Sequence, residues 1–193
     1  LLQDRTGWSP EEISQRVIDF ILGPSRAGVG ATATGAARGA YETALQFSSE
    51  TRVAGKLLIN HEWAQCLLAE MYKNVVQARL TYLEANYANM LYGSFKQFVS
   101  KPGFFINAHM PDIVFKKVFS PLLDRPSTTR QLRKQHLEGQ RVSEQQRVSG
   151  WGSLAKFSAT DLAVKNCHLA MEMMGHAGLR HDQRMEKHFR DAK

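Results

Sequence analysis

Between residues 59 and 92 the sequence repeats apolar residues every three or four positions without a break. The series is Ala64, Leu67, Met71, Val75, Ala78, Tyr82 and Ala85. This spacing puts the side chains on one stripe of an α-helix, because a helix turns once in 3.6 residues. A stripe of this length predicts a long helix that packs lengthwise against other helices.

Residues 26–50 predict a second helix, which is unusually rich in alanine and glycine. Each glycine inside a helix costs up to about 1 kcal/mol relative to alanine. Close approach to a neighbouring helix or to a ligand must therefore offset that cost. Ahead of this segment, Ser9-Pro10-Glu11-Glu12 predicts a helix start, and Gly23-Pro24 predicts the end of that first helix.

The last third of the chain predicts two more helices. One starts at Ser153 and ends at the turn Gly175–Gly178, and a final one begins near His181 or Asp182. The apolar residues of 93–150 show poor periodicity, so this stretch predicts short helices and an exposed arm. The chain is therefore expected to be all-α, an antiparallel four-helix bundle. We divide it into a lead-in helix (1–24) and a bundle domain (25–193) that carries an insertion at about 93–150.

Composition excludes several classes of protein. Apolar residues make up 43% of the chain, enough for a core, but they never form the long uninterrupted run that a transmembrane helix requires. Cys66 and Cys167 are isolated in helical patterns and are expected to be buried reduced thiols. The histidines include no pair at helical i, i+4 spacing, so no metal site is predicted. No Gly-x-Ser-x-Gly elbow occurs, and the glycines near Gly28 follow no strand, so a dinucleotide loop is not indicated.

The positive charge of the chain is local. Its net charge is +7, and the stretch from Lys116 to Arg147 holds eight basic residues against three acidic ones. The stretch lacks interleaved aromatic residues, so a nucleic-acid site is not indicated. A solvated arm or an arm that faces another subunit is the preferred interpretation.

Two blocks of sequence resemble the C-terminal helical domain of acyl-CoA dehydrogenases. The first, residues 25–79, combines the small-residue helix with Gly55-Lys56, Leu-Ala-Glu-Met and Ala-Arg, in the order and spacing of that family. The second, residues 152–193, has an Ala-Lys segment, a glycine turn and Arg-Asp-Ala-Lys. In the family a Tyr-Glu-Gly-Thr-like segment follows, and its Glu is usually the catalytic base. The resemblance therefore implies a fragment with no catalytic residue of its own, whose base is expected beyond Lys193.

The resemblance also implies roles for particular residues. Arg26 matches an Arg beside the substrate site, and Ser25 stands where some members carry an alternative catalytic Glu. The positions that the family turns towards FAD are Arg52, Gly55, Glu62, Gly175, His176 and Gly178. Several of these positions depart from the family pattern: Thr51 holds the place of the flavin-phosphate Arg, Ala54 replaces Phe, Glu62 replaces Gln and His176 replaces Gly. An anionic Glu62 would repel a diphosphate.

By this resemblance, the chain is expected to be the oligomerising, FAD-covering domain of an acyl-CoA dehydrogenase. Such an enzyme oxidises acyl-CoA to 2,3-enoyl-CoA and passes its electrons to an electron-transferring flavoprotein. The implied partners are further copies of the chain in a dimer or tetramer, and the implied compartment is the bacterial cytoplasm or the mitochondrial matrix. Two alternatives stay open: a non-flavin scaffold of the same family, and a basic helical bundle that binds an anionic partner.

Overall fold

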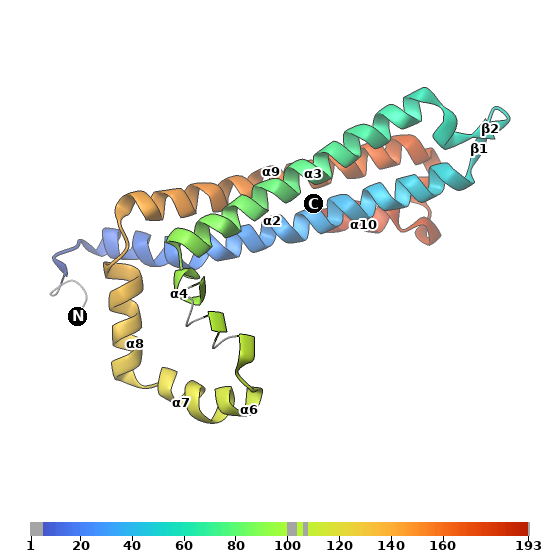
Figure 1. Cartoon of the computed structure of the whole chain (residues 1–193). Helices are drawn as coiled ribbons and strands as arrows, with labels where there is room; N and C mark the ends of the chain where they lie inside the picture. The colour runs from blue at the N-terminus through green and yellow to red at the C-terminus, as the bar shows by residue number, and fades with distance from the viewer. Residues whose placement is uncertain (1–5, 100–103, 106–107, 193) are drawn as a thin grey trace. The chain divides into compact units, whose positions relative to one another are not determined.

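The computed structural model describes residues 6–99, 104–105 and 108–192, and expectations that fall on other residues lie outside it. Long helices dominate the described chain (Figure 1). In order, its elements are α2 (Pro10–Glu50), β1 (Arg52–Val53), β2 (Lys56–Leu57), η1 (Leu58–Asn60), α3 (Glu62–Tyr92), α4 (Lys96–Val99), α6 (Asp112–Val114), η2 (Phe115–Phe119), α7 (Ser120–Leu123), α8 (Pro126–Arg133), η3 (Lys134–Glu138), α9 (Val142–Met174), η4 (Gly175–Leu179), η5 (His181–Gln183) and α10 (Met185–Ala192). The predicted all-α class is confirmed.

The chain divides into two compact units. The first comprises Leu1–Ser25 and Ala85–Gly152, and the second comprises Arg26–Glu84 and Ser153–Lys193. Each long helix therefore contributes one part of its length to each unit.

The predicted helix end at Gly23-Pro24 is wrong, because α2 continues through both residues. Proline inside a helix removes one backbone hydrogen bond and costs about 3 kcal/mol. Packing within the first unit opposes that cost. Gly23 is buried, and a methyl group there would lie 3.0 Å from Val148 Cγ1 and 3.4 Å from Asn89 Oδ1.

Two other helix boundaries also differ from the prediction. The helix expected from Ser153 begins at Val142, inside the region assigned to the insertion. The helix expected near His181 begins at Met185, after the 3-10 turn η5. Helix ends are weakly encoded in sequence, because polar residues such as those around 142–150 suit both a helix and a loop.

The second unit is a bundle of α2, α3, α9 and α10 around one buried cluster. In this unit α3 runs antiparallel to α2 and α9 (Figure 1). The cluster takes residues from all four helices and from the 3-10 helix η1, which follows the hairpin. It consists of Ala40, Ala44, Leu58, Ala64, Leu68, Met71, Cys167, Ala170, Met173, Met174 and Met185.

Small residues let α2 and α9 approach closely. A methyl group at Gly30 would lie 2.9 Å from the backbone oxygen of Ala155, which is closer than non-bonded atoms approach. The predicted reason for the small residues of α2, close approach to a neighbouring helix, is therefore found at this position.

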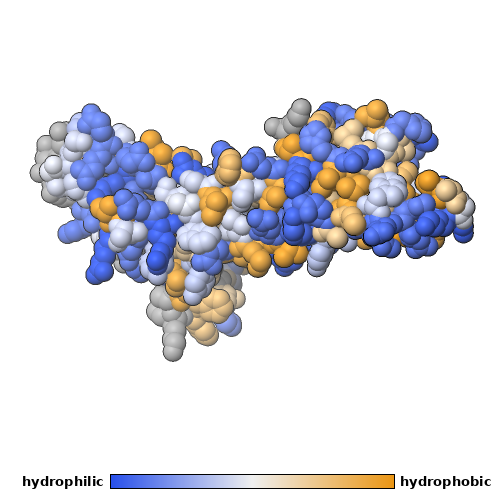
Figure 2. Space-filling model, turned by 90° about the horizontal axis from the view of Figure 1, so that it is seen from above, coloured by the Kyte–Doolittle hydropathy of each residue, from blue (hydrophilic) through white to orange (hydrophobic). Residues whose placement is uncertain are grey.

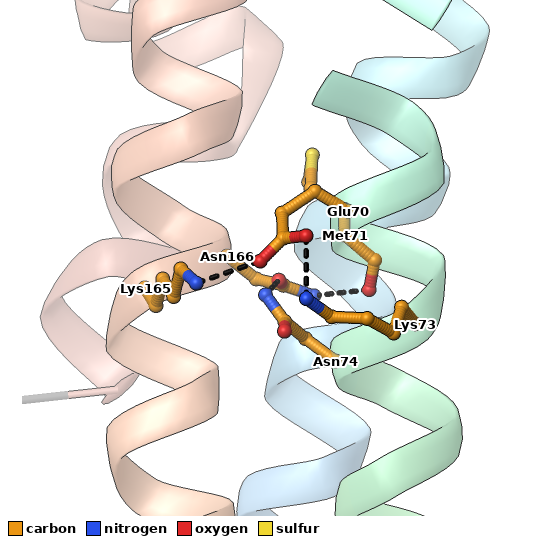
Figure 3. Close-up of polar contacts among 6 residues, drawn as sticks. All are labelled: Glu70, Met71, Lys73, Asn74, Lys165 and Asn166. Carbon is orange, nitrogen blue, oxygen red and sulfur yellow. Dashed lines mark hydrogen bonds and ion pairs between the residues drawn. The ribbon is translucent and has the colours of Figure 1, made fainter. Parts of the chain in front are cut away.

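A buried pair of asparagines joins three helices in the middle of the second unit (Figure 3). Asn74 Nδ2 donates to Asn166 Oδ1 at 2.9 Å. Asn166 Nδ2 in turn donates to the carbonyls of Ala37 (3.2 Å) and Met71 (3.0 Å), so one side chain contacts both other helices. Both side chains are essentially inaccessible to solvent. Polar groups this deep are retained where they are hydrogen-bonded, and they fix which residues face one another.

Beside the buried pair, an ion triad links α3 to α9 at the surface (Figure 3). The Glu70 carboxylate contacts Lys165 at 2.7 Å and Lys73 at 2.5 Å. The hydrogen bond from Lys165, followed by that from Lys73, lowers the pKa of Glu70 to about 2. Glu70 therefore remains ionised throughout the neutral and mildly acidic range.

The first unit joins the start of α2, the end of α3 and the start of α9 through polar contacts. The Asp19 carboxylate accepts hydrogen bonds from Gln145 Nε2 at 3.4 Å and Ser149 Oγ at 3.2 Å. Asn89 Oδ1 and Ser94 Oγ are buried beside a cavity of about 10 Å³ and lack a protein partner among the described residues. That volume is close to the space that one water molecule needs.

His188 lies in the contact between α10 and α2 and has a lowered pKa. Its ring lies against α2, where a methyl group at Gly39 would be 2.7 Å from Cε1. Burial, followed by the charge of Lys187, lowers the pKa of His188; Arg184 acts in the same direction and Asp191 opposes it. The folded state therefore binds this proton less readily than the unfolded state. The stabilising contribution is complete above the ordinary pKa of about 6.5 and is lost as the pH falls below it.

We therefore expect the urea midpoint of the chain to decrease between pH 7.5 and pH 5.5, and His188→Gln to flatten this decrease. His181→Gln is the control, because His181 is exposed and should leave the pH dependence unchanged. A pH dependence that survives in His188→Gln would contradict the assignment.

Candidate functional site

A short hairpin follows α2 and presents the first group of predicted site residues. β1 and β2 pair antiparallel, with Arg52 opposite Leu57. The two turn residues, Ala54 (φ 48°) and Gly55 (φ 82°), both have left-handed backbones, as a tight two-residue hairpin requires. Arg52 is exposed, and its Nη1 donates to Gly55 O at 3.1 Å. The guanidinium is thus tied to the turn while the side chain stays exposed.

The glycine turn after α9 presents the second group. Gly175 has φ 55°, a conformation that favours glycine, and it ends the helix as a C-terminal cap. Gly178 is buried, and a methyl group there would lie 3.4 Å from Met174 Cβ, an ordinary van der Waals contact. His176 is exposed between them.

A hollow of about 610 Å³ lies between the start of α3 and the end of α9. Its lining combines two carboxylates with apolar surface: Glu62, Glu172, Trp63, Cys66 and Leu67. Cys66 is exposed here, so the prediction that it is buried is wrong, whereas Cys167 is buried as predicted. The spacing of apolar residues did not reveal the exposure of Cys66, because Cys66 lies beside Leu67 at the edge of the apolar stripe.

Glu172 was not among the site residues predicted from the sequence. The signal was present, because Glu172 lies three residues before Gly175 and therefore about one helical turn from the glycine turn. Its proximity to Glu62 required the structure, since the two residues are 110 positions apart.

The predicted cofactor residues gather at one end of the second unit, and the predicted substrate residues do not join them. The hairpin, the start of α3 and the end of α9 meet there (Figure 1), joined through the buried cluster. Arg26 begins the α2 portion of this unit and donates to Ser153 Oγ at 3.1 Å. Arg26 and Glu50 are 24 residues apart on one helix, or roughly 36 Å. Ser25 is exposed and belongs to the first unit.

The residues at the hairpin end fit FAD unevenly. The exposed Arg52 could pair with phosphate, and the backbones of Gly55 and Gly175 are open, since a methyl group at either would meet no atom within 4 Å. Glu62 and Glu172 would repel a phosphate but could accept hydrogen bonds from hydroxyl and amino groups of a nucleoside. The site therefore fits the cofactor if its phosphates lie towards Arg52 and its nucleoside lies towards the hollow.

Neither a metal-binding cluster nor a membrane-spanning helix is found among the described residues. They contain no group of three or more His, Cys, Asp or Glu side chains placed to hold a metal ion. None of the helices described is both long and apolar enough to cross a bilayer.

Comparison with known proteins identifies the family. No curated protein matches the chain. The family model described as "Acyl-CoA dehydrogenase, C-terminal domain" matches residues 15–90 and 128–193, about three quarters of the chain, and leaves 91–127 outside the match. The matched ranges contain every predicted site residue and the parts of α2, α3, α9 and α10 that belong to the second unit. From this match and the all-α bundle, we conclude that the chain belongs to the acyl-CoA dehydrogenase family, in which it corresponds to the C-terminal helical domain.

Proposed function

We propose that this chain is the oligomerising and FAD-covering domain of an FAD-dependent acyl-CoA dehydrogenase that acts on an acyl-CoA and delivers electrons to an electron-transferring flavoprotein. The observation that carries the proposal is the convergence of the hairpin and the glycine turn at one end of a bundle of this family. When bound, FAD supplies the hydride acceptor for the oxidation. The compartment we propose is the bacterial cytoplasm or the mitochondrial matrix.

The chain's own residues would bind and orient the cofactor. Arg52 would hold phosphate oxygens by charge-assisted hydrogen bonds, and Gly55 and Gly175 would let the backbone approach them. Arg26 would face the acyl-CoA at the opposite end of this helical unit. Because roughly 36 Å separates these two ends, we propose that the cofactor covered by the hairpin end belongs to a neighbouring protomer. No group in the chain is assigned as the base, so the isolated chain should not oxidise acyl-CoA.

The cofactor part of the proposal is tested by ligand binding. We expect equilibrium dialysis of the chain to show binding of FAD and of ADP, and Arg52→Ala to weaken both about 10-fold or more, since a hydrogen bond to a charged group contributes about 1.5–3 kcal/mol. Lys156→Ala is the matched control, because Lys156 is exposed on α9 away from the hairpin. Unchanged binding in Arg52→Ala would contradict the assigned contact.

A specific observation favours a second candidate, a non-flavin scaffold of the same family. Two carboxylates, Glu62 and Glu172, line the hollow, and no cationic side chain among the described residues lines it. If neither FAD nor ADP binds at millimolar concentration while the chain still self-associates, the non-flavin scaffold becomes the proposed function in place of the FAD-covering domain.

Self-association has a candidate surface on α3. The outer face of this helix carries Tyr72, Val76, Leu80 and Leu83 in exposed positions three or four residues apart. Figure 2 shows hydrophobic side chains interrupting the hydrophilic surface on the face seen from above. Exposed apolar stripes of this kind mark interaction sites, because water contact with them is unfavourable.

We expect the chain to self-associate in sedimentation velocity, and Leu80→Glu to weaken association about 100-fold, because burial of an unpaired carboxylate costs several kcal/mol. Gln77→Glu is the matched control: it adds the same charge to an exposed position of α3 off the stripe. A wild-type monomer at high concentration would contradict the oligomerising role, whatever the flavin measurements show.

A further inference from the structure

Residues 108–141, here called the basic arm, lie in the first unit and carry exposed apolar and basic side chains together. Ile113 is 68% exposed and Val118 is 57% exposed. Val114, Val118 and Leu122 are spaced four residues apart along the continuous helical stretch α6–η2–α7, so they lie near one side of it. Lys116 and Lys117 interrupt this series and are exposed as well. A helix with an apolar side flanked by lysines is typical of peptides that lie in the bilayer interface.

The basic side chains of the arm are not neutralised within the described structure. Lys116, Lys117, Arg125, Arg130, Lys134 and Arg141 are exposed, and none forms an ion pair with a described carboxylate. Much of the arm also lies in residues 91–127, which the family model does not match. The domain fold of the family therefore does not account for this surface.

We propose that the basic arm binds the surface of an anionic lipid bilayer. Lysines and arginines near such a surface each gain about 1 kcal/mol from the negative potential of the headgroups. The apolar side of α6–η2–α7 would enter the acyl boundary, where its side chains leave water. The arm adds no span, because its helices are far shorter than a bilayer is thick.

The positive charge of the arm favours an anionic bilayer over a second copy of the arm as its binding partner. Two copies would bring like charges together, since residues 108–141 hold seven basic residues and three acidic ones. A nucleic acid would satisfy the positive charges but would leave Ile113 and Val118 without an apolar partner. An anionic bilayer satisfies both kinds of side chain.

The test is cosedimentation of the purified chain with vesicles of phosphatidylcholine alone and with added phosphatidylglycerol. We expect binding only to the anionic vesicles, decreasing as salt is raised. Lys116→Ala/Lys117→Ala should lower the partition coefficient about 30-fold, from two charges at about 1 kcal/mol each. Val118→Glu should abolish binding while far-UV circular dichroism stays unchanged, because the side chain is exposed.

Lys56→Ala/Lys156→Ala is the matched control, since it removes the same charge from exposed positions of the second unit. The proposal is supported if this control variant still binds anionic vesicles. The proposal is overturned by no binding to anionic vesicles, by equal binding to neutral ones, or by an equal loss in the control. Binding that Val118→Glu leaves intact, or tighter binding to polyuridylate, would instead identify a purely electrostatic site for polyanions and also overturn it.

Discussion

Gly30→Ala is expected to destabilise the chain by about 1–2 kcal/mol, although alanine is the better helix former. The new methyl group would lie 2.9 Å from the Ala155 backbone oxygen, and a backbone atom can move only if α2 and α9 separate. Overpacking of this kind costs about 1–3 kcal/mol. The gain in helix propensity, up to about 1 kcal/mol, offsets only part of it. Gly30→Leu should cost more, because the larger side chain forces a wider separation.

Two other glycines of α2 provide controls, for which the opposite change in stability is expected. Gly28 and Gly35 are exposed, and a methyl group at either would meet no atom within 4 Å. Gly28→Ala and Gly35→Ala should therefore each stabilise the chain by about 0.5–1 kcal/mol. Urea unfolding followed by circular dichroism measures all of these variants. If Gly30→Ala stabilised the chain as Gly28→Ala does, the close approach of α2 and α9 would be wrong.

Asn166→Ala should destabilise the chain by about 2–4 kcal/mol. The substitution removes the donor to the carbonyls of Ala37 and Met71 and the acceptor for Asn74. Asn74 would then be buried with no partner among these groups, and the lost side chain would leave a cavity. Gln77→Ala, at an exposed position of α3, should change stability by less than about 0.5 kcal/mol.

A double-mutant cycle separates the hydrogen bonds from the volume. Asn74→Leu alone should be destabilising, because it leaves Asn166 Oδ1 without its donor. The pair Asn74→Leu/Asn166→Leu should recover part of the loss, since apolar replacement of both partners removes the cost of unpaired groups. Strict additivity of the two single substitutions would show that the asparagines do not interact. Broadened near-UV circular dichroism in the double variant would indicate that the polar pair fixes the register of the helices.

Alignment of the helices matters for the site, because the site residues come from elements joined only by packing. The hairpin, the start of α3 and the turn after α9 are far apart in sequence and meet around Leu58, Met174 and Met185. A shift of α9 by one helical turn would displace Glu172 from Glu62 by about 5 Å. The asparagine pair and the Glu70 triad both oppose such a shift, since both tie α3 to α9.

Periodicity and local chemistry were enough to predict several elements of this protein. The stripe from Ala64 to Ala85 predicted α3, because burial on one face requires a spacing of three or four residues. The glycine turn at Gly175 was predicted, because left-handed backbone favours glycine. The order of the motifs predicted the family. The helix end at Pro24 was predicted wrongly, because a local preference of about 3 kcal/mol was outweighed by packing of residues distant in sequence.

The fold class, the long helices and the family could be predicted from the amino-acid sequence, because these depend on side-chain spacing within single segments and on motif order. The packing of distant segments was needed to show that Gly30 faces Ala155 while Gly28 faces solvent, that Cys66 is exposed, and that Glu172 joins Glu62. Each of these depends on which face of one helix contacts another. That choice is set by the summed packing and hydrogen bonding of the whole bundle, which no single segment encodes.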